Sequence, residues 1–118
     1  LQVEIHAIPT VREEDGLAMS SRNTYLDSKE RKAAPLLFQT LQQAVVIIQN
    51  DPKQNLEVLS QTLIRQLNSV PQIKIDYLGF VDAESLQPVS QFNGNVCLMV
   101  AAFVGKTRLI DNLLIQTK

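Results

Sequence analysis

The chain has 118 residues, of which 45% are hydrophobic and 19% are charged, and these proportions are typical of a globular protein rather than a disordered one. Its 11 Lys and Arg residues nearly balance 12 Asp and Glu residues, and a net charge of −1 excludes a general attraction to nucleic acid or anionic lipid. The length fits one compact domain, and no apolar run approaches the about 20 residues of a membrane helix.

The N-terminal half predicts a short strand, an irregular segment and a helix. Residues 3–8 are apolar and β-branched, and Pro9 stops them, which predicts a strand. Residues 10–23 have no hydrophobic period and are expected to form a loop. Asp27 and Glu30 form a capping-box pattern that opens a helix. Pro35 is expected to kink or break this helix early. Its apolar positions repeat at three and four residues: Ala34, Leu37, Phe38, Leu41, Ala44, Val45 and Ile48.

The C-terminal half predicts a second helix followed by three strands. Asp51, Pro52 and Gln54 are expected to start this helix with a second capping box, and its apolar face carries Leu56, Leu59, Leu63 and Leu67. Strands are predicted at residues 73–81, 96–104 and 108–115. The turns between them are short, which favours antiparallel pairing. The expected fold is therefore α+β, with two helices packed on a small antiparallel sheet of about three strands.

Several features that invite a chemical interpretation have an ordinary structural one. The GKT sequence at residues 105–107 lacks the second glycine of a phosphate loop, because Val100 stands there, and it joins two strands. His6, the only histidine, lies in a predicted strand without a Ser or Cys at a recognisable spacing, so a structural or surface role is favoured over a general base. Cys97 lies in an apolar run and has no second cysteine to pair with, which favours a reducing compartment.

Three further groups of side chains are interpreted from their place in the predicted elements. Asp111 and Asn112 interrupt an apolar run, and we expect them on the solvent face of an edge strand, with contact to a ligand as the alternative. Residues 29–32, KERK, mix both charge signs in a first helical turn and are expected to face solvent. Tyr77 and Phe80 are expected in the core, on the sheet.

Residues 15–23, DGLAMSSRN, fit neither a helix nor a strand pattern. Asp15 and Gly16 form a turn dipeptide, after which Ser20, Ser21 and Arg22 offer two hydroxyls, backbone N–H groups and a guanidinium fork. This set suits a polyphosphate, because arginine binds phosphate oxygens in a bidentate way. The alternative is a loop whose polar groups bind water and cap the following helix, and spacing alone favours that alternative.

The order of residues around this loop resembles a known family. IPTVREEDGLAMSSRNTYLDSKER is similar to the segment that identifies the pantothenate synthetases, or pantoate–β-alanine ligases. DYLGFVDAESLQPV and VAAFVGKTRLIDN resemble later blocks of that family, in the same order. The resemblance implies a two-domain enzyme, with a Rossmann-like N-terminal domain that carries a His-x-Gly-His motif and a smaller C-terminal domain that closes over ATP. By this resemblance, residues 1–9 end the Rossmann-like domain and residues 10–118 form the C-terminal domain.

The resemblance also implies the reaction. In this family, pantoate attacks the α-phosphate of ATP to give pantoyl adenylate and pyrophosphate, and β-alanine then displaces AMP to form pantothenate, a step toward coenzyme A. Carried over by position, Ser20 and Ser21 would hydrogen-bond phosphate oxygens, Arg22 would supply positive charge, and Met19 would pack near the nucleotide. Val11 matches a position where backbone N–H and C=O groups contact the adenine edge.

The same resemblance sets expectations for the rest of the site and for the assembly. Arg12 and Asp15 match the family pattern, and support of the loop is their expected role. Mg²⁺ is expected to be held mainly by ATP and by the missing N-terminal domain, with no metal ligand in this chain. The chain begins without Met and contains no His-x-Gly-His motif, so we expect it to be a piece of a longer protein. By the resemblance, that longer protein is expected to be a cytoplasmic homodimer. This piece alone is expected to be inactive and monomeric.

Two other functions remain open at this point. The chain is alternatively a non-catalytic α+β interaction module that has kept the fold but not the reaction. A fragment of a tRNA synthetase would need a basic surface for RNA, and the near-neutral charge balance disfavours it.

Overall fold

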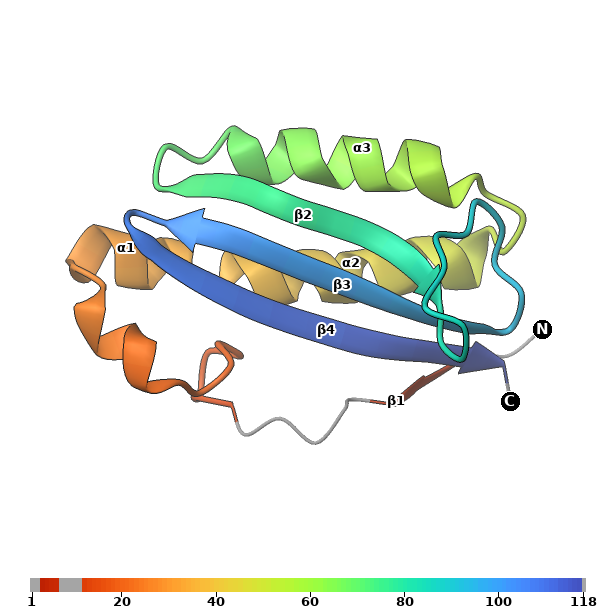
Figure 1. Cartoon of the computed structure of the whole chain (residues 1–118), viewed down its shortest axis with the longest axis horizontal. Helices are drawn as coiled ribbons and strands as arrows, with labels where there is room; N and C mark the ends of the chain where they lie inside the picture. Colours follow the sequence, from red (N-terminus) through yellow and green to blue (C-terminus); the bar gives the residue numbers. More distant parts are fainter. Residues whose placement is uncertain (1–2, 7–11, 118) are drawn as a thin grey trace.

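Four antiparallel strands form one layer of the structure, and helices cover one face of that layer (Figure 1). The computed structural model describes residues 3–6 and 12–117. The strands are β1 (Val3–His6), β2 (Ile73–Asp82), β3 (Asn95–Val104) and β4 (Thr107–Thr117), in the spatial order β1-β4-β3-β2. The helices are α1 (Ser28–Ala33), α2 (Leu36–Asn50) and α3 (Leu56–Asn68), preceded by a short 3-10 helix, η1 (Ser21–Tyr25).

A proline divides one apolar stripe of the sequence into α1 and α2. The Asp27 carboxylate accepts a hydrogen bond from the Glu30 N–H at 2.8 Å, and the Glu30 carboxylate accepts one from the Asp27 N–H at 3.0 Å, which confirms the predicted capping box. α1 ends at Ala33 and α2 begins at Leu36, so the early break expected at Pro35 is also confirmed. The apolar stripe faces the sheet. Phe38 is half-buried, and the other members of the stripe are buried: Ala34, Leu37, Leu41, Ala44, Val45 and Ile48.

The start of α3 differs from the prediction. Asp51 lies in the turn that ends α2, where its carbonyl oxygen accepts a hydrogen bond from the Gln54 N–H at 3.1 Å, so Asp51, Pro52 and Gln54 form no capping box. The cap is Asn55, whose side chain accepts a hydrogen bond from the Val58 N–H at 3.0 Å. Asn55 directly precedes Leu56, the first leucine of the buried face, whereas Asp51 lies before the turn. The expected apolar face is confirmed by four buried side chains: Leu56, Leu59, Leu63 and Leu67.

The three long strands form the antiparallel sheet that the sequence predicts. Val104 pairs with Thr107 across the turn between β3 and β4, so GKT is a tight turn between strands, as expected. Gly105 has a φ of +61°, a region that favours glycine. A Cβ at this position would collide with the Glu30 carboxylate of α1. The turn therefore packs closely against the helix that follows the loop.

β1 adds a fourth strand to this sheet. It pairs antiparallel with the end of β4, from Val3 opposite Thr117 to His6 opposite Leu114. His6 therefore belongs to a strand, as predicted. The assignment of residues 1–9 to a Rossmann-like domain and of residues 10–118 to a C-terminal domain stays a prediction. The predicted adenine contact, Val11, lies outside the described residues.

The core lies between the helices and the inner face of the sheet. Alternate residues of β3 point into it and are almost fully buried: Val96, Leu98, Val100, Ala102 and Val104. Phe80 is 3% exposed, as expected, but the prediction for Tyr77 is wrong, because its side chain is 45% exposed. The β2–β3 register shifts between Ile75 and Tyr77. An extra residue in one strand sends the following side chains to the opposite face.

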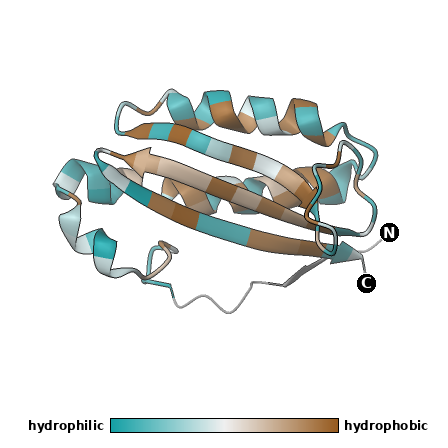
Figure 2. Cartoon of the chain, viewed as in Figure 1, coloured by the Kyte–Doolittle hydropathy of each residue, from teal (hydrophilic) through white to brown (hydrophobic). Residues whose placement is uncertain are grey.

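Apolar residues run along β3 from Val96 to its end at Val104, while many polar residues lie on the helix surfaces and in the loops (Figure 2). β3 lies between β2 and β4 and has the continuous apolar sequence of a central strand. Within the described ranges, no helix combines the length and the apolar character needed to cross a membrane.

The corrected cap of α3 can be tested by comparing two substitutions. Asn55→Ala removes the acceptor for the Val58 N–H and should lower the free energy of unfolding by about 1 kcal/mol. Asp51→Ala, at the position that the sequence pattern favours, should change it by less than about 0.5 kcal/mol. Urea denaturation followed by circular dichroism measures both values, and a larger loss for Asp51→Ala would contradict the assignment of the cap.

Candidate functional site

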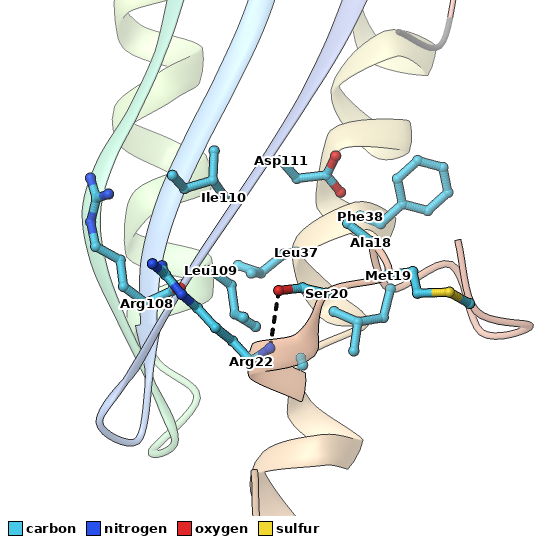
Figure 3. A pocket seen from close by; sticks show the side chains of 12 residues that line it. Ala18, Met19, Ser20, Arg22, Leu37, Phe38, Arg108, Leu109, Ile110 and Asp111 are labelled. Carbon is cyan, nitrogen blue, oxygen red and sulfur yellow. Dashed lines mark hydrogen bonds between the residues drawn. The ribbon is translucent and has the colours of Figure 1, made fainter. Parts of the chain in front are cut away.

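A cavity of about 290 Å³ lies between the loop, the start of α2 and the start of β4 (Figure 3). The loop contributes Leu17, Ala18, Met19, Ser20 and Arg22, α2 and the residues before it contribute Ala34, Leu37 and Phe38, and β4 contributes Arg108, Leu109, Ile110 and Asp111. Apolar side chains therefore form much of the wall, while the hydroxyl and guanidinium groups come from the loop and from the first residues of β4. Such a mixture suits a ligand with one apolar and one anionic part.

The loop before the cavity is a small hairpin. Arg12 pairs with Ala18 in an antiparallel bridge, and the Glu13 N–H donates a hydrogen bond to the Leu17 carbonyl oxygen at 2.9 Å. Gly16 turns this hairpin with a φ of +92°, and a Cβ there would come within 2.7 Å of the Phe38 ring. Leu17 is 4% exposed and belongs to the core cluster. The hairpin is thus attached to the domain directly before Met19 and Ser20.

Arg12 and Asp111 form a buried ion pair between the loop and β4. Arg12 donates two hydrogen bonds to the Asp111 carboxylate, from Nη1 to Oδ2 at 2.6 Å and from Nη2 to Oδ1 at 2.8 Å. Nη1 also donates to the Gly16 carbonyl oxygen at 3.0 Å, and the guanidinium carbon lies 3.8 Å from the centroid of the Phe38 ring. The two side chains are only 14% and 6% exposed. This pair supports the loop, which is the role expected for Arg12.

The expectation that Asp111 and Asn112 lie on the solvent face of a strand is therefore wrong for Asp111. Asp111 occupies an inward position of β4, in alternation with Leu109 and Leu113, and its burial is possible because Arg12 neutralises it. Asn112 is half-buried, and its Oδ1 is buried without a hydrogen-bond partner among the described residues.

A second set of charges holds the tip of the hairpin to α1. Arg31 contacts Asp15 through Nη1 and Oδ2 at 2.6 Å and Glu13 through Nη2 and Oε2 at 3.2 Å. Asn23 donates hydrogen bonds to Glu13 Oε2 at 2.9 Å and to the Ala18 carbonyl oxygen at 3.0 Å. The prediction that KERK only faces solvent is thus wrong for Arg31, because the folded loop brings two carboxylates to it. Asp15 supports the loop, as expected.

The structure brings most of the predicted phosphate-binding residues to the cavity. Ser20 is the N-cap of η1, and its Oγ accepts a hydrogen bond from the Arg22 N–H at 3.2 Å. Arg22 is exposed, and its Nη1 donates to the Arg108 carbonyl oxygen at 3.4 Å. The Met19 side chain is 57% exposed at the cavity. Ser21 is exposed within η1 but is not among the residues that line the cavity.

Sequence reasoning assigned no contact with the loop to Asp111 and no role to Arg108. A signal for Asp111 existed in the alternation of β4: positions 109, 113 and 115 are inward-facing and apolar, so an acid at position 111 shares their face and needs a buried cation. No comparable signal marks Arg108, because its place at the cavity depends on how the loop folds over β4.

The described residues contain no group of three or more His, Cys, Asp or Glu side chains that could hold a metal ion. The acid beside the cavity, Asp111, is already engaged by Arg12. Burial raises the pKa of the Cys97 thiol, which disfavours the thiolate that a nucleophile requires.

The family model described as pantoate-beta-alanine ligase matches residues 1–114. The chain belongs to the pantoate-beta-alanine ligase family. The pantothenate synthetase of Thermosipho melanesiensis is 45% identical over 115 residues, which are 98% of this chain and 40% of that protein. The pantothenate synthetase of Clostridium botulinum (strain Loch Maree / Type A3) is 42% identical over 93% of this chain and 39% of its own length. The chain thus spans about 40% of the curated relatives it matches.

Solved structures of this ligase family share the fold. The pantothenate synthetase of Thermus thermophilus superposes with a TM-score of 0.75 at 39% identity, over 89% of this chain and 37% of that one. The pantoate-beta-alanine ligase of Francisella tularensis, complexed with Beta-gamma ATP and Beta-alanine, superposes with a TM-score of 0.55 at 30% identity, over 89% of this chain and 31% of that one. These likenesses confirm the predicted α+β fold of helices packed on an antiparallel sheet.

We expect the buried ion pair to be the costliest charged contact to break. Asp111→Ala leaves the Arg12 guanidinium without its buried partner and should lower the free energy of unfolding by about 3 kcal/mol. Asp76→Ala, which removes the exposed partner of Arg108, should cost less than about 1 kcal/mol. Chemical denaturation measures both losses, and equal losses would show that burial does not govern the strength of the Arg12 contact.

The Asp15 carboxyl should titrate at unusually low pH. The hydrogen bond from Arg31, aided by the Leu17 N–H, holds the Asp15 pKa below its ordinary value of 3.8. A lowered folded-state pKa means that the contact contributes stability above about pH 4 and loses it as the pH falls through the folded-state value. Carbon-detected NMR titration measures this pKa. Arg31→Ala should return it toward 3.8, whereas the exposed neighbour Lys32→Ala should leave it low.

Proposed function

We propose that this chain is the C-terminal, ATP-binding part of a pantothenate synthetase. One observation carries the proposal: the loop segment that matches the family brings Met19, Ser20 and Arg22 to one cavity, beside an apolar wall from α2 and β4. A nucleotide combines an apolar base with an anionic tail, and this cavity offers a partner for each. The complex of the Francisella tularensis ligase with Beta-gamma ATP and Beta-alanine supports the choice of ligands.

The hydrogen bonds of the loop leave its donors available to an anion. Ser20 Oγ accepts a bond from the Arg22 N–H, so its own O–H proton is free to donate to a phosphate oxygen. Within the described residues the Arg22 guanidinium donates only to the Arg108 carbonyl oxygen, at the long distance of 3.4 Å. An exposed side chain with such a weak contact can turn toward phosphate oxygens, which bind its fork bidentately.

The proposed reaction joins two anions in its first step, and this explains the need for such donors. A carboxylate oxygen of pantoate attacks the α-phosphorus of ATP, and the bond from that phosphorus to pyrophosphate breaks. The amine of β-alanine then attacks the carbonyl carbon of the adenylate, AMP leaves, and the amine loses a proton as pantothenate forms. In the first step, Arg22 and Ser20 would stabilise negative charge on the phosphates as the nucleophile approaches. Ser21, which is exposed at the start of η1, would add a second hydroxyl.

The chain supplies only part of this proposed site. Met19 would pack against the nucleotide, since its side chain is exposed at the cavity. The pantoate pocket, the ligands of Mg²⁺ and the homodimer contact are proposed for the part of the relatives that this chain does not span. Inactivity of the chain by itself stays a prediction for the same reason. The alternative of a non-catalytic interaction module predicts no nucleotide-dependent chemistry even in the intact protein.

Replacement of Arg22 tests this proposal in the intact protein. Arg22→Ala should reduce the rate of pyrophosphate release by about 100-fold or more, because one positively charged contact to the phosphates is lost. It should leave the thermal unfolding midpoint unchanged, since Arg22 is exposed. The matched control is Arg65→Ala, which removes an exposed arginine from α3 and should keep the full rate. A coupled pyrophosphate assay with pantoate and ATP measures both rates, and a normal rate for Arg22→Ala would refute its assignment.

A further inference from the structure

Arg108 places a second guanidinium beside the proposed phosphate site. It is the second residue of β4, directly after the tight turn, and it lines the same cavity as Ser20 and Arg22. Its carbonyl oxygen accepts the hydrogen bond from Arg22 Nη1, so the two residues are in direct contact. Figure 3 shows the Arg22 and Arg108 side chains on the same side of the cavity. Two elements far apart in sequence thus bring the Arg22 side chain to the backbone of Arg108.

The present partner of the Arg108 guanidinium is a weak one. Nε and Nη2 both donate to a single oxygen, Oδ2 of Asp76 on β2, at 3.1 and 3.0 Å. The two side chains are 42% and 46% exposed. Exposed pairs of this kind contribute little to stability, because solvent screens them and their side chains lose entropy. The contact orients the Arg108 side chain, but it is weak enough for Arg108 to exchange Asp76 for another anion.

The charge around the cavity favours an anion with several negative charges. The residues that line the cavity include two arginines, Arg22 and Arg108, and one acid, Asp111. Arg12 already neutralises Asp111 through two hydrogen bonds. Asp76 in the same way neutralises Arg108, so Arg22 is left without a carboxylate partner among the described residues and the charge beside the cavity is positive. A polyphosphate can accept hydrogen bonds from the guanidinium groups of both Arg22 and Arg108, whereas the Asp76 carboxylate accepts them from Arg108 alone.

We propose that Arg108 is a second phosphate-binding residue of the ATP site, and that Asp76 holds it aside until the nucleotide binds. This inference rests on the proposed function and extends it. On binding, Arg108 exchanges the Asp76 carboxylate for phosphate oxygens, next to Arg22 and Ser20. Asp76 then acts as an internal competitor of ATP. The two partners of one ion pair consequently have opposite effects on nucleotide affinity.

The opposite signs define the experiment, which measures ATP binding to the intact protein by calorimetry. Arg108→Ala should raise the dissociation constant of ATP by about tenfold, the usual effect of one lost charge-assisted contact. Asp76→Asn should lower it by about twofold to fivefold, because the competing carboxylate is gone. In an Arg108→Ala background, Asp76→Asn should have no effect. Arg108→Lys, which keeps the charge and loses the fork, should fall between wild type and Arg108→Ala.

Controls separate this mechanism from a simpler structural role. Glu84→Gln removes another exposed carboxylate, in the turn after β2, and should leave the affinity for ATP unchanged. Unchanged thermal unfolding midpoints show that all variants fold. If Asp76→Asn and Arg108→Ala both weaken ATP binding, the pair merely supports the β4 strand and the proposal is overturned.

The Arg22→Ala variant separates a failure of the proposed role of Arg108 from a failure of the proposed function. Loss of ATP binding in Arg22→Ala together with normal binding in Arg108→Ala would leave the proposed function standing and refute the role of Arg108. Absence of ATP binding by the intact wild-type protein would refute both. Weaker binding in both variants, with tighter binding in Asp76→Asn, is the result that we expect.

Discussion

Two short hydrogen bonds from the Arg12 guanidinium to the Asp111 carboxylate join the start of the loop to β4, across 99 positions of sequence. The same guanidinium lies against the Phe38 ring of α2 and contacts the Gly16 carbonyl oxygen. A buried charge is costly without its partner, so the hairpin has little freedom to leave this place. The position of Met19, Ser20 and Arg22 follows from that constraint, because they continue the chain from the anchored hairpin.

Charged residues near the cavity fall into two classes that differ in burial. The Arg12–Asp111 pair is buried and fixes the backbone, whereas Arg22 and the Arg108–Asp76 pair are exposed and weakly held. Ion pairs in water contribute little to stability, so their members can change partners at small cost. The proposed phosphate site would need both classes, because it would first bind and then release a polyphosphate. The buried pair provides position, and the exposed arginines provide charge that a ligand can recruit.

The proposed reaction requires no nucleophile from the protein. In the proposed reaction the attacking groups belong to the substrates, a carboxylate and then an amine. The protein has to align them and to stabilise phosphate charge, which hydroxyl and guanidinium donors can do.

The sequence by itself determined the elements whose signals are local: the Asp27–Glu30 capping box, the break at Pro35, the leucine face of α3 and the tight turn at Gly105. It also determined the family, through the order of residues around the loop. Tertiary structure decided what depends on contacts between distant segments. A register shift between β2 and β3 exposes Tyr77. Asn55, and not Asp51, caps α3. Arg31 forms ion pairs with Glu13 and Asp15 of the loop. Asp111 can be buried because Arg12 forms an ion pair with it. The two residues lie far apart in the sequence, so the local pattern around Asp111 does not show that Arg12 is its partner.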